Sequence, residues 1–118
     1  LATPSLHAAI AALKDREHRD YVRSETALLR DEVTQKLTGA GIHVYPGHGN
    51  FILMEMGGRE SLAREMDAAL RAEGISLRRF ASPAFDRCLR MTLGRHAETR
   101  TATDAIIRLY QDMREARA

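Results

Sequence analysis

The segment Cys88–Gly94 places one charged residue, Arg90, inside an otherwise mostly apolar run. Alternation along a strand directs every second residue, from Leu89 to Leu93, to one face and Arg90 to the other. A buried arginine is costly unless an anion pairs with it. The strand alone leaves two partners open. One is a neighbouring carboxylate in a structural ion pair, and the other is a ligand gripped by the planar guanidinium.

The composition is that of an ordinary folded domain and argues against several classes of function. Hydrophobic residues make up 44% and charged residues 29% of the 118 residues, which suits one domain over residues 1–118. The net charge is only +2, the two signs interleave in runs such as residues 14–20, and 5% of residues are aromatic. We therefore expect no nucleic-acid partner. No apolar run approaches the length of a membrane span, so we also expect no membrane partner.

A single cysteine, Cys88, excludes an intrachain disulfide and fits a reducing compartment. Because Cys88 lies in the expected buried strand, we interpret it as an inert core thiol and predict a cytoplasmic protein.

Two helical segments are expected before the first strand. Ser5 is a plausible N-cap, and Leu6, Ile10 and Leu13 follow at helical spacing. Asp15 is a good N-cap for a second segment, so we expect a kink or break near Lys14-Asp15. The second segment ends at Gly39. Its apolar face is predicted to hold Val22, Thr26, Leu29, Val33 and Leu37.

Four short strands and two more helices are expected after Gly39. The strands are predicted over residues 42–45, 50–56, 75–80 and 88–94, and the helices over 59–73 and 97–116. Residues 50–56 lack a clean alternation, which predicts a central strand covered on both faces. The order of elements indicates an α+β fold: a small, mainly antiparallel sheet of about four strands with helices packed on one face.

No pattern typical of a metal site or a catalytic nucleophile stands out. His43 and His48 are close in sequence, but a strand end and a turn separate them. We expect no metal ligand and no catalytic residue in this chain. Arg78 and Arg79 are more informative, because alternation turns them to opposite faces. A surface ion pair is one interpretation; a functional one needs an anion between this strand and Arg90.

Four motifs in a fixed order resemble a known family. They are Leu13-Lys14-Asp15-Arg16-Glu17-His18, the stretch from Gly41 through Pro46 to Asn50-Phe51-Ile52-Leu53, Gly74-Ile75-Ser76-Leu77-Arg78, and Leu89-Arg90-Met91-Thr92-Leu93-Gly94. Together they resemble the C-terminal small domain of fold-type I pyridoxal-phosphate-dependent aminotransferases of class I/II. The nearest branch is the histidinol-phosphate aminotransferases of histidine biosynthesis.

The resemblance implies roles for three residues. Arg90 matches the arginine that grips the α-carboxylate of the amino-acid or 2-oxo-acid substrate. Arg78 is a weaker candidate toward the active-site side, and Asn50 is a weaker candidate near the domain junction. The family usually has Pro-Gly where this chain has Pro83-Ala84, which loosens assignment to one subfamily. A homodimer that uses pyridoxal phosphate is implied for the full-length enzyme.

The lysine that binds the cofactor as a Schiff base has no match in this chain. The two lysines, Lys14 and Lys36, lie on polar helix faces, where an amine of low pKa is implausible. Because the chain begins at Leu1, we expect a C-terminal fragment whose missing large domain holds the cofactor, so that the chain alone is inactive. Without that domain, the Ala-rich stripe of the first helix is expected to self-associate.

The alternative is a free-standing, non-catalytic α+β module for ligand binding or interaction. The reading frame upstream of Leu1 would discriminate between the two.

Overall fold

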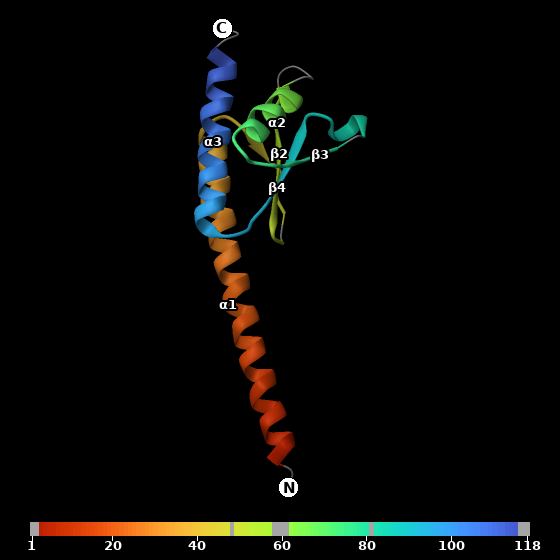
Figure 1. Cartoon of the computed structure of the whole chain (residues 1–118), viewed down its shortest axis with the longest axis vertical. Helices are drawn as coiled ribbons and strands as arrows, with labels where there is room; N and C mark the ends of the chain where they lie inside the picture. Colours follow the sequence, from red (N-terminus) through yellow and green to blue (C-terminus); the bar gives the residue numbers. More distant parts are fainter. Residues whose placement is uncertain (1–2, 48, 58–61, 81, 116–118) are drawn as a thin grey trace.

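The computed structural model describes residues 3–47, 49–57, 62–80 and 82–115 (Figure 1). Its elements are the helix α1 (Thr3–Gly39), the strands β1 (His43–Val44) and β2 (Phe51–Glu55), the helix α2 (Leu62–Ala72), the strand β3 (Arg78–Arg79), the 3-10 helix η1 (Pro83–Phe85), the strand β4 (Cys88–Thr92) and the helix α3 (His96–Glu115). The expected α+β fold with a four-stranded antiparallel sheet is confirmed. The strands are shorter than predicted, most of all β3. Residues 59–61 and 116 of the predicted helices lie outside the described residues.

Helix α1 is one uninterrupted helix of 37 residues, so the expected break near Lys14-Asp15 is wrong. Asp15 has the side chain of an N-cap, but no glycine or proline occurs between Ser5 and Thr38, and the alanines favour helix. Ser5 lies inside the helix instead of capping it. Pro4 fits the first turn, where its missing N–H has no intrahelical partner to lose.

The four strands pair in the order β1-β2-β4-β3. Helix α1 packs against β1 and β2, α2 packs against β3 and β4, and α3 lies on α1 and α2 (Figure 1). The face toward the helices holds the apolar core, which includes Ile52, Met54, Leu89 and Met91. The helices therefore cover one face of the sheet, as the sequence predicted.

The second face of the sheet is open. Burial alternates along β2, with Phe51 39% exposed and Leu53 and Glu55 half-buried. The expectation that residues 50–56 are covered on both faces is therefore wrong. An apolar run can hide an alternation when the side chains of the open face are themselves apolar, as Phe51 and Leu53 are.

Ion pairs fasten α3 to the upper part of α1. Arg100 donates from Nε and Nη2 to the two carboxylate oxygens of Glu32, at 2.8 and 3.1 Å. This charged hydrogen bond holds the pKa of Glu32 below its usual range and raises that of Arg100. Lys36 lies 4.0 Å from Asp104 of α3. The pairs hold α3 against the half of α1 that faces the core.

The other half of α1 extends beyond the sheet and the other helices, so the molecule measures 73 × 27 × 26 Å (Figure 1). Only the last three residues of the predicted apolar face, Leu29, Val33 and Leu37, are buried, and Val22 is 46% exposed. In the part of the chain that the structure describes, no helix combines the length and apolarity needed to cross a membrane.

Candidate functional site

Two arginines oppose each other on neighbouring strands of the sheet. Arg78 of β3 and Arg90 of β4 are Cα partners in the antiparallel register, and the other neighbour of Arg90 is Leu53 of β2. Like charges directly opposite each other are destabilising. Within the described residues, neither guanidinium has a carboxylate at ion-pair distance. An anion bound between Arg78 and Arg90 would relieve this repulsion.

The Arg90 side chain lies on the Phe51 ring, with its guanidinium carbon 5.4 Å from the ring centre. This cation–π contact positions the side chain without neutralising it. The Nε atom of Arg90 is buried and has no hydrogen-bond partner among the described residues. A buried donor without an acceptor costs ~1–3 kcal/mol. No described residue compensates the cost of this unpartnered Nε.

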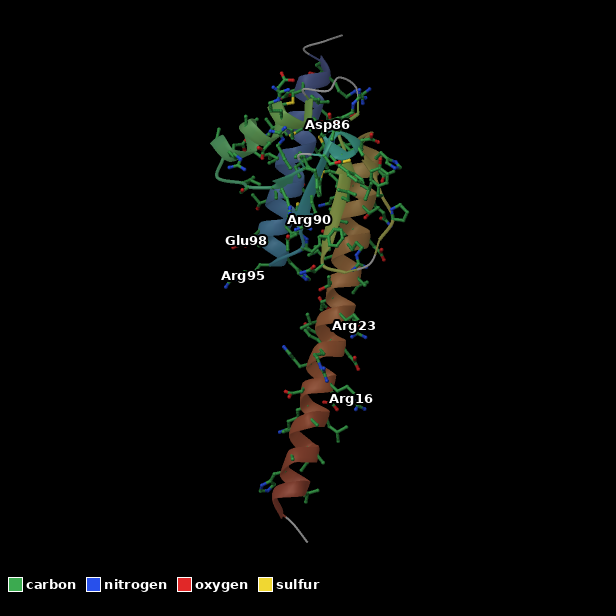
Figure 2. All side chains as sticks on the ribbon, turned by 90° about the vertical axis from the view of Figure 1, so that its right-hand side faces the viewer. Arg16, Arg23, Asp86, Arg90, Arg95 and Glu98 are labelled. Atoms are coloured by element: carbon green, nitrogen blue, oxygen red, sulfur yellow. The ribbon has the colours of Figure 1, made fainter. Side chains whose placement is uncertain are left out.

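Arg78 and Arg90 line an open groove of about 840 Å³. Residues 74–77, which lead into β3, and the first turns of α3 also line it. This volume falls within the range of small-molecule sites, ~300–1,000 Å³. Among the described residues that line the groove, Glu98 is the one with an acidic side chain. Figure 2 shows Glu98 close to Arg95 and below Arg90 in that view. Within the described residues, no ion pair joins Glu98 to either arginine of the groove.

Asn50, the third predicted site residue, does not line this groove. Its carbonyl oxygen accepts a hydrogen bond from the Leu93 N–H at 2.6 Å. The preceding residue, Gly49, accepts a hydrogen bond from Nη2 of Arg30 on α1. The segment before β2 is thus held from both α1 and the end of β4. Because Phe51 follows directly, these contacts also fix the ring on which Arg90 lies.

Tyr45, Glu55 and Cys88 lie at the opposite end of the open face. The Tyr45 hydroxyl donates to Oε2 of Glu55 at 3.1 Å, which raises the pKa of Tyr45, and the His43 ring stands edge-on to the Tyr45 ring. Burial, with smaller effects of Glu55 and Asp86, raises the pKa of the Cys88 thiol. A raised pKa keeps the thiol neutral, which fits the predicted inert role of Cys88. The described residues contain no cluster of three or more His, Cys, Asp or Glu side chains suited to a metal ion.

Phe51 and Arg30 are the two site residues that sequence reasoning missed. Phe51 lies in the apolar run that the sequence predicts to be covered on both faces, so nothing in the sequence distinguishes its exposed ring from the buried side chains. Arg30 lies in a helix rich in charged side chains, and only the fold brings it to the Gly49 carbonyl. The available signal for Phe51 was strand alternation, which places Phe51 on the same face as Leu53.

Known proteins resemble this chain in both sequence and structure. The family model described as "Aminotransferase class I and II" matches residues 1–106. The histidinol-phosphate aminotransferase of Nitrobacter winogradskyi is 35% identical over 107 residues, which cover 90% of this chain and 29% of that protein. The protein of the same name from Rhodospirillum rubrum is 37% identical over 103 residues, covering 86% of this chain and 28% of the relative.

A solved structure with the same fold is that of histidinol-phosphate aminotransferase from Sinorhizobium meliloti in complex with pyridoxal-5'-phosphate. It aligns with a TM-score of 0.77 and 26% identity, over 90% of this chain and 29% of that chain. The present chain spans less than a third of the length of these relatives. Since the family model matches almost the whole sequence, the chain belongs to the class I and II aminotransferase family.

Proposed function

We propose that this chain forms the small domain of a pyridoxal-phosphate-dependent aminotransferase and that Arg90 grips the anionic end of the substrate. The observation that carries the proposal is the opposed pair Arg78 and Arg90, with the buried, unpartnered Nε of Arg90, in an open groove. Two cations without a carboxylate between them, held on a rigid sheet, are suited to bind a small dianion or monoanion.

The chain's part in catalysis is to orient the substrate. A guanidinium fork binds a carboxylate through two parallel hydrogen bonds, which sets the rotation of the amino acid about its own axis. That rotation decides which bond at Cα is aligned for reaction. Phe51 sets the plane of the fork, and Arg78 adds a second positive charge. Movement of the domain over the active site would then bring the bound substrate to the reacting atoms.

Pyridoxal phosphate supplies the electron sink for this reaction when it is bound. The residues of this chain do not fit a Schiff-base site: Lys14 is exposed on α1, Lys36 lies 4.0 Å from Asp104, and neither lines the groove. We assign the cofactor-binding lysine to a large domain outside this chain. The chain alone is then expected neither to bind the cofactor covalently nor to transfer amino groups.

The names of the relatives favour a phosphate-bearing substrate of the histidinol-phosphate type. Guanidinium groups bind phosphate and carboxylate with the same planar fork, so one pair of arginines can serve both half-reactions of a transaminase. We propose that Arg90 binds the phosphate or the α-carboxylate in turn and that Arg78 assists. We place Asn50 at the domain junction and propose a homodimer for the full-length enzyme.

The test is a fusion in which this chain replaces the aligned segment of the Nitrobacter winogradskyi enzyme. Arg90→Ala in the fusion should lower kcat/KM about 30- to 150-fold, the equivalent of losing ~2–3 kcal/mol of charged hydrogen bonding. Arg78→Ala should have a smaller effect. Arg79→Ala is the matched control, because Arg79 is exposed on the same strand but pairs with Leu89 and does not line the groove.

An unchanged kcat/KM in the Arg90→Ala fusion would refute the assignment of Arg90. An equal loss in the Arg79→Ala fusion would point to a general electrostatic effect instead of a specific clamp. The expected inactivity of the chain alone is checked by adding cofactor and recording the absorbance of a Schiff base. A signal that disappears when Lys14 or Lys36 is replaced would contradict it.

A further inference from the structure

The open face of the sheet is polar at both ends, and the two ends differ in charge. One cross-strand row begins at Tyr45, just after β1, and continues through Leu53 of β2. The row then passes Arg90 of β4 and ends at Arg78 of β3. The two arginines make one end of this row cationic. At the other end, the Tyr45 hydroxyl donates to the carboxylate of Glu55 at 3.1 Å.

The Glu55 carboxylate is held in place but is not neutralised. Its Oε2 atom accepts the hydrogen bond of Tyr45. Within the described residues, no arginine, lysine or histidine lies at ion-pair distance from Glu55. His43 is its Cα partner on β1, and the His43 ring stands edge-on to the Tyr45 ring. Because a carboxylate has about four lone-pair sites, one hydrogen bond from a neutral hydroxyl leaves room for a cation.

The separation of Glu55 from Arg90 suits a small extended molecule. The two residues lie on neighbouring strands, two positions apart along them, since Arg90 is the partner of Leu53. A strand spacing of ~4.8 Å and a rise of ~3.4 Å per residue place their Cα atoms ~8 Å apart. The contact with Phe51, on the far side of Leu53 along β2, draws the Arg90 guanidinium away from Glu55. One ligand can therefore reach both charges, although the charges do not pair with each other.

We propose that Glu55 and Tyr45 form a second subsite, which selects substrates that carry a basic group at the end opposite to the anion bound by Arg90. This inference deepens the proposed function and rests on it. The α-amino group of an amino acid cannot reach Glu55, because it is attached to the carbon next to the carboxylate. The substrate class therefore has a further ammonium, imidazolium or guanidinium group ~8–10 Å from its anion. Tyr45 is the positioning residue of the subsite, because its hydroxyl fixes the direction of the carboxylate.

Selection follows from the cost of covering an unpaired carboxylate. A substrate with the basic group forms a charged hydrogen bond with Glu55. A substrate without it removes water from the carboxylate and offers no replacement partner.

A purely structural role is the alternative for the Tyr45–Glu55 pair, because diagonal cross-strand pairs stabilise a sheet. That role predicts a loss of stability on substitution and no discrimination between ligands. The shape of the face favours the subsite. Tyr45 and Phe51 line a second groove of about 550 Å³ at the β1 side, so the surface is hollowed at this end as well as beside Arg90.

The experiment measures ligand binding to the fusion with the Nitrobacter winogradskyi enzyme by isothermal titration calorimetry, which needs no catalytic turnover. The probes are 6-aminohexanoate and 8-aminooctanoate, whose charges lie about 7 and 10 Å apart when extended. Each is compared with the alkanoate of the same length, hexanoate or octanoate, which lacks only the ammonium group. We expect the better amino compound to bind about 3- to 10-fold more tightly than its alkanoate.

Substitutions in the fusion assign this advantage to Glu55. Glu55→Gln should abolish it and leave the affinity for the alkanoate unchanged, whereas Arg90→Ala should weaken the binding of both compounds. Tyr45→Phe should reduce the advantage, and it decides the question if the Glu55→Gln fusion does not fold. The matched control is Asp112→Asn, which also turns an exposed carboxylate into an amide but lies on α3, on the helix side of the sheet. It should keep the full advantage.

Equal affinities for the amino compound and its alkanoate, with both weakened by Arg90→Ala, would overturn this inference and leave the proposed function standing. An alkanoate affinity that Arg90→Ala does not change would overturn the proposed function and this inference with it. An advantage that Glu98→Gln or Asp112→Asn abolishes and Glu55→Gln does not would overturn the assignment to Glu55.

Discussion

The two faces of the sheet differ in burial and in the kind of side chain that they carry. Toward the helices, Ile52, Met54, Leu89 and Met91 are at most 3% exposed and belong to one apolar core. On the open face, Phe51 and Arg90 form a cation–π pair, and Arg90 also lines the groove. Strands β2 and β4 thus contribute core residues on one face and candidate binding residues on the other.

This difference shows why a costly residue can persist in the middle of a small domain. The buried donor of Arg90 and its repulsion from Arg78 are unfavourable for folding. The opposite face supplies enough apolar burial for the sheet to hold both arginines in place. If stability and binding are divided between the two faces, substitutions on the two faces should have different consequences.

The largest expected effect on stability comes from the covered face. Leu89→Ala should lower the free energy of unfolding by ~3 kcal/mol, since Leu89 is fully buried and the substitution leaves a cavity. Leu53→Ala, on the open face of the adjacent strand, should lower it by less than ~1 kcal/mol. Urea unfolding of both variants measures the two losses. Similar losses would contradict the division between faces.

A change of opposite sign is expected at the centre of the open face. Arg90→Met keeps the length of the side chain and removes the unpartnered Nε, a gain of ~1–3 kcal/mol. It also loses the cation–π contact with Phe51, ~0.5–1 kcal/mol, so the net result should be a gain of ~1 kcal/mol. Urea unfolding tests this, with Arg79→Met as the control. A destabilised Arg90→Met variant would show that Arg90 has a structural role.

A smaller effect is expected for the ring beneath Arg90. Phe51→Leu in the fusion enzyme should raise KM for the amino-acid substrate about 3-fold, because the lost cation–π contact is worth ~0.5–1 kcal/mol. The ring is 39% exposed, so the free energy of unfolding should change little. Steady-state kinetics and urea unfolding of the same variant separate binding from stability. A large loss of stability with unchanged KM would assign Phe51 to the core.

The smallest effect concerns pH and Cys88. Burial raises the pKa of this thiol in the folded chain. Above the ordinary thiol pKa of ~8.5, the unfolded chain releases a proton that the folded chain retains, so stability should fall as pH rises. Cys88→Ala should show a weaker fall over the same range. Thermal unfolding between pH 7 and pH 10 checks the slope, and parallel curves for the two proteins would argue against a buried, neutral thiol.

The α+β fold was predictable from sequence, and so was the position of Arg90 on the strand face opposite Leu89 and Met91. Alternation in a strand and spacing in a helix are local properties. The break near Asp15 was not a sound prediction. An N-cap residue starts a new helix only where the preceding backbone leaves the helical conformation, and no glycine or proline near Asp15 breaks the helix. The prediction that residues 50–56 are covered on both faces failed for a related reason, since composition alone does not reveal what packs against a strand.

By itself, the sequence determined which residues share a face and that four motifs follow the order of an aminotransferase small domain. Only the tertiary structure decided that Arg78 stands opposite Arg90, that Phe51 lies under the guanidinium, and that half of α1 extends beyond the sheet. The physical reason is the distance along the chain over which the deciding contacts form. Periodicity follows from the backbone of one element, whereas register and coverage depend on contacts between elements far apart in the chain.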